Sequence, residues 1–237
     1  MAYTLKSNPS PGLPVTREQT LLSIYETLLE SLGPSRWWPA ETPFEVCIGA
    51  ILTQNTNWSN VEKALKRLKT RHLLDPRRIA GLSVDELGDI IRPAGYFRVK
   101  ARRILNFLDY LGQKAGWDLE VLKKEALEDL RSELLTVKGI GPETADSMLL
   151  YAFKKPSFVV DAYTERICSR HGLTPEGMAY EELRSFFMDV LPPDIQFLNE
   201  YHALLVRVGK NWCPKKEGRC AACPLGPLLE GTAPGVM

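Results

Sequence analysis

The chain has 237 residues, of which 44% are hydrophobic, so it is long enough to bury a core and is not a disordered chain. Its 30 basic and 29 acidic residues give a net charge of +1, so the overall charge does not indicate a nucleic-acid partner and any basic surface must be local. No stretch is apolar for long enough to span a bilayer, and the N-terminus lacks the core of a signal peptide, which predicts a cytoplasmic protein with no membrane partner.

The N-terminal part of the chain predicts a flexible lead-in followed by a helix. Residues 1–15 are rich in proline and serine and lack apolar periodicity. Thr16 and Gln19 then form a capping-box pattern ahead of apolar residues at helical spacing. This first helix is expected to end near Gly33, because glycine followed by proline stops a helix.

A buried helix and a polar turn are expected next. Residues 44–52 are apolar on nearly all sides, which is typical of a helix inside a bundle. Residues 53–57 place amides and hydroxyls directly after it. Asn57 can cap a further helix over residues 58–68, whose basic outer face is expected to be solvated.

The rest of the chain has the periodicity of helices. Ser83 and Glu86 open a helix that is broken at residues 93–95, and a long amphipathic helix begins at Tyr96. Similar spacing indicates helices over residues 127–135, 145–152, 162–170, 180–191 and 195–208. Strand-like alternation is absent almost everywhere, so the sequence predicts an all-α protein.

Residues 135–145 predict two helices joined by a tight hairpin. Gly139 and Gly141 allow positive φ or close backbone approach, and Pro142 suits the first position of a helix, where no N–H is needed. The free N–H groups of such a hairpin can bind an anion, and a phosphodiester fits. An ordinary helix-helix turn is the alternative. The residues expected to contact a phosphate backbone are Lys138, Gly139, Ile140, Gly141 and Thr144.

An apolar run over residues 156–160 then leads to Asp161, which precedes a periodic helical stretch. Hairpin, loop and aspartate together resemble the helix-hairpin-helix DNA glycosylases, in which this aspartate is catalytic. The resemblance implies a catalytic role for Asp161. A plain N-cap of the helix that starts at Ala162 is the alternative, and the two roles are compatible.

The five cysteines indicate a metal site, because an odd number of thiols in a reducing compartment argues against a disulfide framework. Cys213, Cys220 and Cys223 lie in one short loop, with metal-type spacing. They match the first three ligands of the C-terminal [4Fe-4S] loop of the endonuclease III family, while Leu229 stands at the position of the fourth. The resemblance implies a [4Fe-4S] cluster with a non-cysteine or exogenous fourth ligand; zinc and an empty loop are the alternatives.

The resemblance extends from Thr16 to Cys223, and Glu143 is its most informative departure. Bifunctional members of the endonuclease III family carry a lysine at that position, whose amine forms a Schiff base with the deoxyribose. A carboxylate cannot form one. Base removal would then use water and leave the strand uncut, which implies a monofunctional enzyme.

Within that family the chain is similar to the bacterial 3-methyladenine DNA glycosylases. The similarity implies an aromatic base pocket at Trp37, Trp38 and Trp58, and a strand-gap-filling role for Gln54. Two adjacent indoles cannot both lie on one helical face, so exposure of one or both is expected; filling of the core is the alternative for each Trp. A polar cap to the preceding helix is the alternative for Gln54. The similarity rests on five short sequence motifs: Trp37-Trp-Pro39, Leu52-Thr-Gln-Asn-Thr56, Arg92-Pro-Ala-Gly95, Lys138-Gly-Ile-Gly141 and Val160-Asp161.

Two helical subdomains with a DNA-binding cleft between them are expected from this resemblance. The first is a six-helix domain over residues 37–153, and the second combines residues 16–36 with 154–237. The implied function is base-excision repair: a monomeric glycosylase that removes alkylated purines of the 3-methyladenine type from damaged double-stranded DNA. Two alternatives are a glycosylase for another lesion, such as an oxidised pyrimidine or a mismatched base, and a non-catalytic DNA-binding protein.

Overall fold

The computed structural model describes residues 16–35, 37 and 40–230. In this part of the chain every regular element is helical and there is no strand, so the all-α prediction is confirmed. None of the described helices is both long and apolar enough to cross a membrane. The expected flexible N-terminus and the Trp38 side chain lie outside the described residues.

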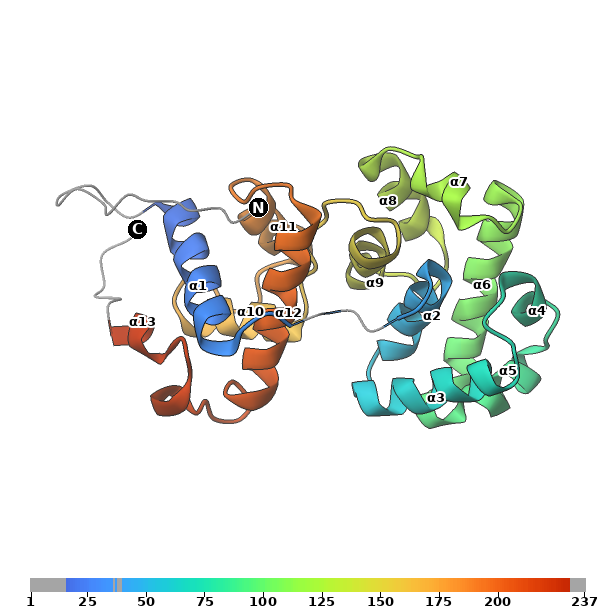
Figure 1. The fold of residues 1–237 in the computed structure, drawn as a ribbon, viewed down its shortest axis with the longest axis horizontal. Helices are drawn as coiled ribbons and strands as arrows, with labels where there is room; N and C mark the ends of the chain where they lie inside the picture. Colours follow the sequence, from blue (N-terminus) through green and yellow to red (C-terminus); the bar gives the residue numbers. More distant parts are fainter. Residues whose placement is uncertain (1–15, 36, 38–39, 231–237) are drawn as a thin grey trace.

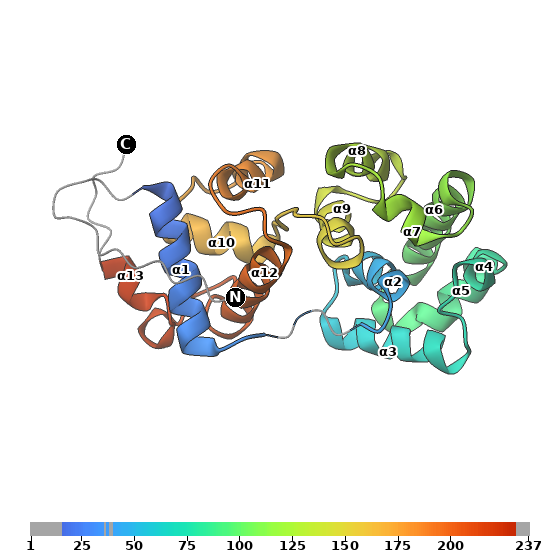
Figure 2. The ribbon, with the colours of Figure 1, turned by 45° about the horizontal axis from the view of Figure 1, so that its top comes forward.

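The helices form two groups that lie side by side in both ribbon views (Figures 1 and 2). The larger group contains α2 (Pro43–Thr53), α3 (Trp58–Thr70), α4 (Pro76–Ala80), α5 (Val84–Ile91), the 3-10 turn η1 (Arg92–Ala94), α6 (Phe97–Ala115), α7 (Leu119–Lys123), α8 (Leu127–Thr136), α9 (Pro142–Ser147) and the π-helical turn η2 (Met148–Ala152). The smaller group contains α1 (Arg17–Leu32), α10 (Ala162–Arg170), α11 (Tyr180–Met188), α12 (Ile195–Asn211), the 3-10 turn η3 (Cys220–Ala222) and α13 (Gly226–Glu230). Because α1 packs against α12, the smaller group is built from both ends of the chain.

The larger group has more helices than the six expected. Its described residues form eight α-helices, and α4 and α7 have only five residues each. A five-residue helix is too short to show an amphipathic repeat, so periodicity does not reveal it.

Local capping explains most of the helix boundaries. The capping boxes at Thr16 and Ser83 are both present, and the Asn57 side chain accepts from the N–H of Asn60. Tyr96 differs from expectation, because it precedes α6 in a left-handed conformation with φ of 44° and its side chain is 71% exposed. The long helix therefore begins one residue later, at Phe97.

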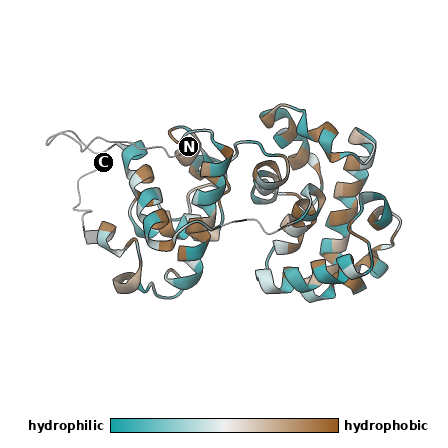
Figure 3. Ribbon diagram, in the orientation of Figure 1, coloured by the Kyte–Doolittle hydropathy of each residue, from teal (hydrophilic) through white to brown (hydrophobic). Residues whose placement is uncertain are grey.

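Helix α2 forms the centre of the larger group, with every residue from Phe44 to Leu52 buried. Hydrophobic and hydrophilic positions alternate along the other helices, as amphipathic helices require (Figure 3).

Lys100 is also buried, and its ammonium donates to the carbonyls of Leu52 and Ala94 at 2.8 and 2.7 Å. These bonds satisfy carbonyls at the ends of α2 and η1 that have no helical partner.

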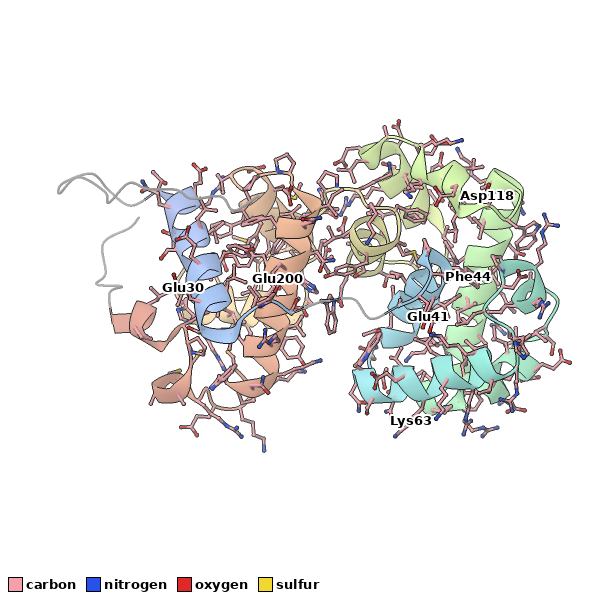
Figure 4. The ribbon with its side chains drawn as sticks, in the orientation of Figure 1. Glu30, Glu41, Phe44, Lys63, Asp118 and Glu200 are labelled. Carbon is pink, nitrogen blue, oxygen red and sulfur yellow. The ribbon has the colours of Figure 1, made fainter. Side chains whose placement is uncertain are left out.

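The segment after α1 crosses from the smaller group to the larger one and is tied down by α12. Glu200, labelled on α12 in Figure 4, accepts from the backbone N–H and the hydroxyl of Ser35 at 2.7 and 3.0 Å. Arg207 on the same helix donates to the carbonyls of Gly33 and Leu32. These contacts fix the backbone that leads to Trp37.

A buried ionic network joins the hairpin helices to the smaller group. Asp146 on α9 is fully buried and accepts two hydrogen bonds from Arg131 of α8, at 2.9 and 3.1 Å. The hydroxyls of Ser157 and Tyr180 donate to the same carboxylate at 2.6 and 2.8 Å. Arg184 of α11 donates to Ser157 and lies 3.5 Å from Asp146. One carboxylate thus connects four separate segments of the chain.

Candidate active site

A cleft of about 930 Å³ opens between the two groups of helices. One wall is formed by the turn after α2 and by the hairpin, and the other by the start of α10 and by α12. The cleft brings together side chains that are far apart in the sequence. Among those that line it are Trp37, Gln54, Glu143, Asp161, His202 and Lys210.

The hairpin between α8 and α9 places backbone groups at the cleft. Gly139 has a φ of 103°, and a Cβ there would collide with the Arg103 side chain, so only glycine fits. Lys138 and Gly141 are exposed, whereas the Ile140 side chain lies in the core. The N–H of Ile140 donates to the carbonyl of Val137 at 2.9 Å, so it is not free for a phosphate as expected. Contact of the hairpin backbone with an anion is left to the N–H groups of Gly139 and Gly141.

Gln54 is the C-cap residue of α2, and its side chain is held against the hairpin. Its amide nitrogen donates to the carbonyl of Gly139 at 3.1 Å and to the hydroxyl of Thr144 at 2.9 Å. Its amide oxygen accepts from Arg103. Thr144 is 6% exposed and its hydroxyl accepts from Gln54, so this hydroxyl does not face solvent as a group that contacts a DNA backbone would. Entry of Gln54 into a DNA strand gap would require these three hydrogen bonds to break.

Asp161 is the N-cap of α10 and also faces the cleft. Its Oδ1 accepts from the backbone N–H groups of Tyr163 and Thr164 at 3.0 and 2.8 Å, and from the Thr164 hydroxyl at 3.0 Å. Its Oδ2 lies 3.7 Å from Nε2 of His202, and 13% of the side chain is exposed. One oxygen therefore caps the helix and the other faces the cleft, so the capping role leaves the catalytic interpretation of Asp161 open.

The charge of Asp161 is maintained by its neighbours. Burial alone raises its pKa, but His202 and the hydrogen bonds from Thr164 outweigh burial and hold the pKa of Asp161 below its ordinary value of 3.8. The carboxylate is consequently ionised at neutral pH. An ionised group in this position can stabilise positive charge that develops on a sugar, or orient a water molecule.

Glu143 lies on the opposite side of the cleft, near the start of α9. The surrounding protein, and secondly the negative charge of Asp161, raise the pKa of Glu143 to about 7. The Glu143 carboxyl is therefore partly protonated at neutral pH. Glu143 therefore places a carboxyl group, neutral or charged depending on pH, where the resemblance would put a lysine amine.

Two indoles line the same space. The ring centroids of Trp37 and Trp58 are 5.9 Å apart with an interplanar angle of 49°, and both side chains are half-buried. The ammonium of Lys210 lies 5.6 Å from the centroid of Trp37, so this ring already contacts a cation. Trp58 donates its indole N–H to Glu62 at 2.8 Å. Both rings are placed to contact a ligand in the cleft, whereas Trp38 lies outside the described residues.

The sequence patterns did not reveal His202, Tyr151 or Arg103 as parts of this site. His202 and Tyr151 occur inside apolar helical stretches, where they resemble core residues. Only one signal was available: a histidine on the otherwise apolar face of residues 195–208.

The cysteine loop forms a second cavity, of about 430 Å³, on the far side of α10 and α12. Cys213, Cys220 and Cys223 line it, together with His171, and Arg170 donates to Sγ of Cys213 at 3.2 Å. Within the described part of the chain no three acidic, histidine or cysteine groups converge closely enough to hold a single ion. The structure thus brings the three cysteines to one cavity, as their spacing predicts.

Comparison with known proteins agrees with this arrangement. The family described as HhH-GPD superfamily base excision DNA repair protein matches residues 48–193, more than half of the chain. MJ1434 of Methanocaldococcus jannaschii, a candidate DNA repair glycosylase by its name, is 46% identical over 87% of this chain and 94% of its own length. Endonuclease III of Thermotoga maritima is 31% identical over 76% of this chain and 79% of its own.

Solved structures share the fold. The H. pylori 3-methyladenine DNA glycosylase MagIII bound to 1,N6-ethenoadenine matches with a TM-score of 0.70 and 27% identity, over 82% of this chain and 97% of that chain. A non-covalent endonuclease III–DNA complex matches with a TM-score of 0.76 over 89% of this chain and 94% of that one; its 24% identity shows the fold alone. The chain therefore belongs to the HhH-GPD superfamily of base excision DNA repair proteins, as an endonuclease III-like DNA glycosylase.

Proposed function

We propose that the protein is a monofunctional glycosylase that hydrolyses the N-glycosidic bond of alkylated purines of the 3-methyladenine type in double-stranded DNA and leaves an abasic site. One observation carries the proposal: an ionised Asp161, two indoles and a carboxyl group at the lysine position line a single cleft. The likeness to MagIII, itself a 3-methyladenine DNA glycosylase, supports it at 27% identity.

The indoles suit a positively charged base. Alkylation at N3 or N7 gives a purine positive charge, and an indole face attracts a cation by about 0.5–2 kcal/mol. Lys210 beside Trp37 demonstrates such a contact at 5.6 Å. Because alkylation also weakens the glycosidic bond, leaving-group activation needs little from the protein.

Asp161 would then act on the sugar and water. The base reaches the cleft after it is flipped out of the duplex, which costs a few kcal/mol. The Asp161 carboxylate stabilises the oxocarbenium-like sugar and orients or deprotonates the attacking water. Water adds at the sugar carbon, the base leaves with the bonding electrons, and the strand remains intact. The exposed hairpin amides and Lys138 are proposed to hold the phosphate backbone.

An excision assay on duplexes with single lesions tests this function. We expect release of 3-methyladenine-type bases, strand breaks only after hot alkali, and no crosslink to DNA with sodium borohydride, because Glu143 cannot form a Schiff base. Lys210 is the amine that lines the cleft, so Lys210→Ala provides the control for any trace of trapping.

Three other results would contradict parts of the proposal. Efficient borohydride trapping by the unmodified protein would make the enzyme bifunctional, with Lys138 or Lys210 as the candidate amine. Excision of oxidised pyrimidines or mismatched bases alone would assign another lesion. DNA binding without excision of any base would leave a non-catalytic DNA-binding protein.

We propose further that Cys213, Cys220 and Cys223 hold a [4Fe-4S] cluster. The 430 Å³ cavity and the hydrogen bond from Arg170 to Cys213 support this assignment. Leu229 stands at the position of the fourth cysteine, so the fourth ligand is proposed to be a non-cysteine or an exogenous group; His171 and Glu217 line the same cavity.

The purified protein is accordingly expected to be straw to brown and to lose its colour on oxidation more readily than a four-cysteine cluster would. Cys220→Ser should lower the iron content and the visible absorption, whereas Cys47→Ala, a buried thiol in α2 far from the loop, should leave both unchanged. Colourless protein containing stoichiometric zinc, or no metal, would refute the cluster.

A further inference from the structure

His202 is a buried polar residue whose position the proposed chemistry does not yet explain. It lies on α12 with 6% of its surface exposed. Its Nε2 lies 3.7 Å from Oδ2 of Asp161 and makes no hydrogen bond within the described residues. Buried nitrogen atoms without a hydrogen bond are rare and call for a functional reason.

Tyr151 fixes the orientation of the His202 ring. The Tyr151 hydroxyl forms a hydrogen bond with Nδ1 of His202, and the two ring centroids are 6.0 Å apart. Tyr151 is 2% exposed and belongs to η2, the continuation of the hairpin helix. A hydroxyl that donates to Nδ1 leaves the ring proton on Nε2, which is the nitrogen that faces Asp161.

The two oxygens of Asp161 have different surroundings. Oδ1 accepts three hydrogen bonds from the start of α10. Among the described residues, Oδ2 accepts no backbone hydrogen bond, and Nε2 of His202 lies 3.7 Å from it. Glu143 from α9 and Tyr151 from η2 face this pair, and Lys210 of α12 lines the same cleft over the Trp37 ring.

We propose that His202 is a positioning residue for excision: its Nε2–H holds Oδ2 of Asp161 toward the cleft in the charged form, with Tyr151 fixing the imidazole. The 3.7 Å separation closes to a hydrogen bond, directly or through one water, when the substrate excludes bulk solvent. The role rests on the proposed glycosylase function but not on which base is excised. The lowered pKa of Asp161, to which His202 contributes, is consistent with it.

Three substitutions test the proposal on whichever lesion the wild-type protein excises. His202→Leu keeps the volume and removes the donor, while His202→Gln can restore an N–H near the position of Nε2. Tyr201→Phe is the matched control, because Tyr201 is the adjacent buried residue of α12 and its hydroxyl donates to Leu21 at 2.8 Å, away from Asp161. The measurements are the single-turnover excision rate, the Kd for a duplex with an abasic-site analogue, and the pH profile of the rate.

We expect His202→Leu to lower the single-turnover rate by about tenfold or more with an unchanged Kd, and His202→Gln to recover most of the rate. Tyr201→Phe should stay within about twofold of wild type, as expected for a residue outside the site. In His202→Leu the acidic limb of the pH profile should move to higher pH. The reason is that Asp161 loses a group that favours its charged form, so its pKa rises and the carboxylate is protonated earlier as the pH falls.

Wild-type rates and an unmoved acidic limb in His202→Leu would overturn the positioning role while leaving the glycosylase function intact. Equal losses in His202→Leu and a well-folded His202→Gln would also overturn it, because the donor would then not be what matters. If His202→Leu does not fold, Tyr151→Phe decides: a slowed rate supports the proposal and an unchanged rate refutes it. A wild-type protein that excises no base would refute the proposed function first, and the role of His202 with it.

Discussion

Replacement of Asp161 by asparagine is expected to lower base excision by about a hundredfold or more while the affinity for DNA stays nearly unchanged. Asparagine keeps the oxygen that accepts from Tyr163 and Thr164, and it is itself a good N-cap, so α10 should be preserved. What is lost is the negative charge at Oδ2. The pKa of Asp161 lies below its ordinary value of 3.8, so the wild-type carboxylate is charged from about pH 5 upward. The variant's excision rate should therefore stay below the wild-type rate across that whole range.

The measurement is single-turnover excision beside a binding assay on an abasic-site analogue. Asp194→Asn is the matched control: Asp194 caps α12 by accepting from Phe197 at 2.8 Å, and it lies outside the cleft. It should excise at the wild-type rate. An Asp161→Asn variant that also excises at nearly the wild-type rate would reduce Asp161 to a helix cap.

The second large effect is on stability. Asp146→Ala is expected to lower the free energy of unfolding by about 3–5 kcal/mol, the cost of removing one partner of a buried ion pair. Asp146 is fully buried. The substitution leaves Arg131 with the exposed Glu181 as its remaining charged partner among the described residues. It also leaves the buried hydroxyl of Ser157 without its acceptor.

Urea unfolding followed by circular dichroism measures this loss. Asp189→Ala removes an exposed carboxylate that lies 3.7 Å from Arg17, and it should cost about 0–1 kcal/mol. Because the Asp146 network joins the hairpin helices to α11, the variant is also expected to lose excision activity at a lower temperature than wild type does. A change in unfolding free energy below about 1 kcal/mol for Asp146→Ala would mean that the network is not what joins the two groups of helices.

Features that depend on a few neighbouring residues could be predicted from the sequence. The capping boxes at Thr16 and Ser83 are local, and the structure forms both. The hairpin glycines and Asp161 could likewise be located from a short motif, because their conformations are set by adjacent backbone. Helices α4 and α7 escaped prediction since five residues do not complete an amphipathic repeat.

Tertiary structure decided which polar residues share the cleft. The Tyr151–His202 pair is separated by 51 residues and Gln54 from Thr144 by 90, and no local pattern encodes either contact. Glu143 illustrates the division. The sequence identifies a carboxyl group at the lysine position, but its pKa of about 7 depends on the protein that surrounds it in the cleft and on the charge of Asp161. The sequence by itself determined the longer helices and the hairpin, because these follow from backbone conformation and residue spacing, while the resemblance to a known family indicated Asp161 as the catalytic candidate. The arrangement of charges around that candidate arises only when helices distant in the chain pack together and exclude water.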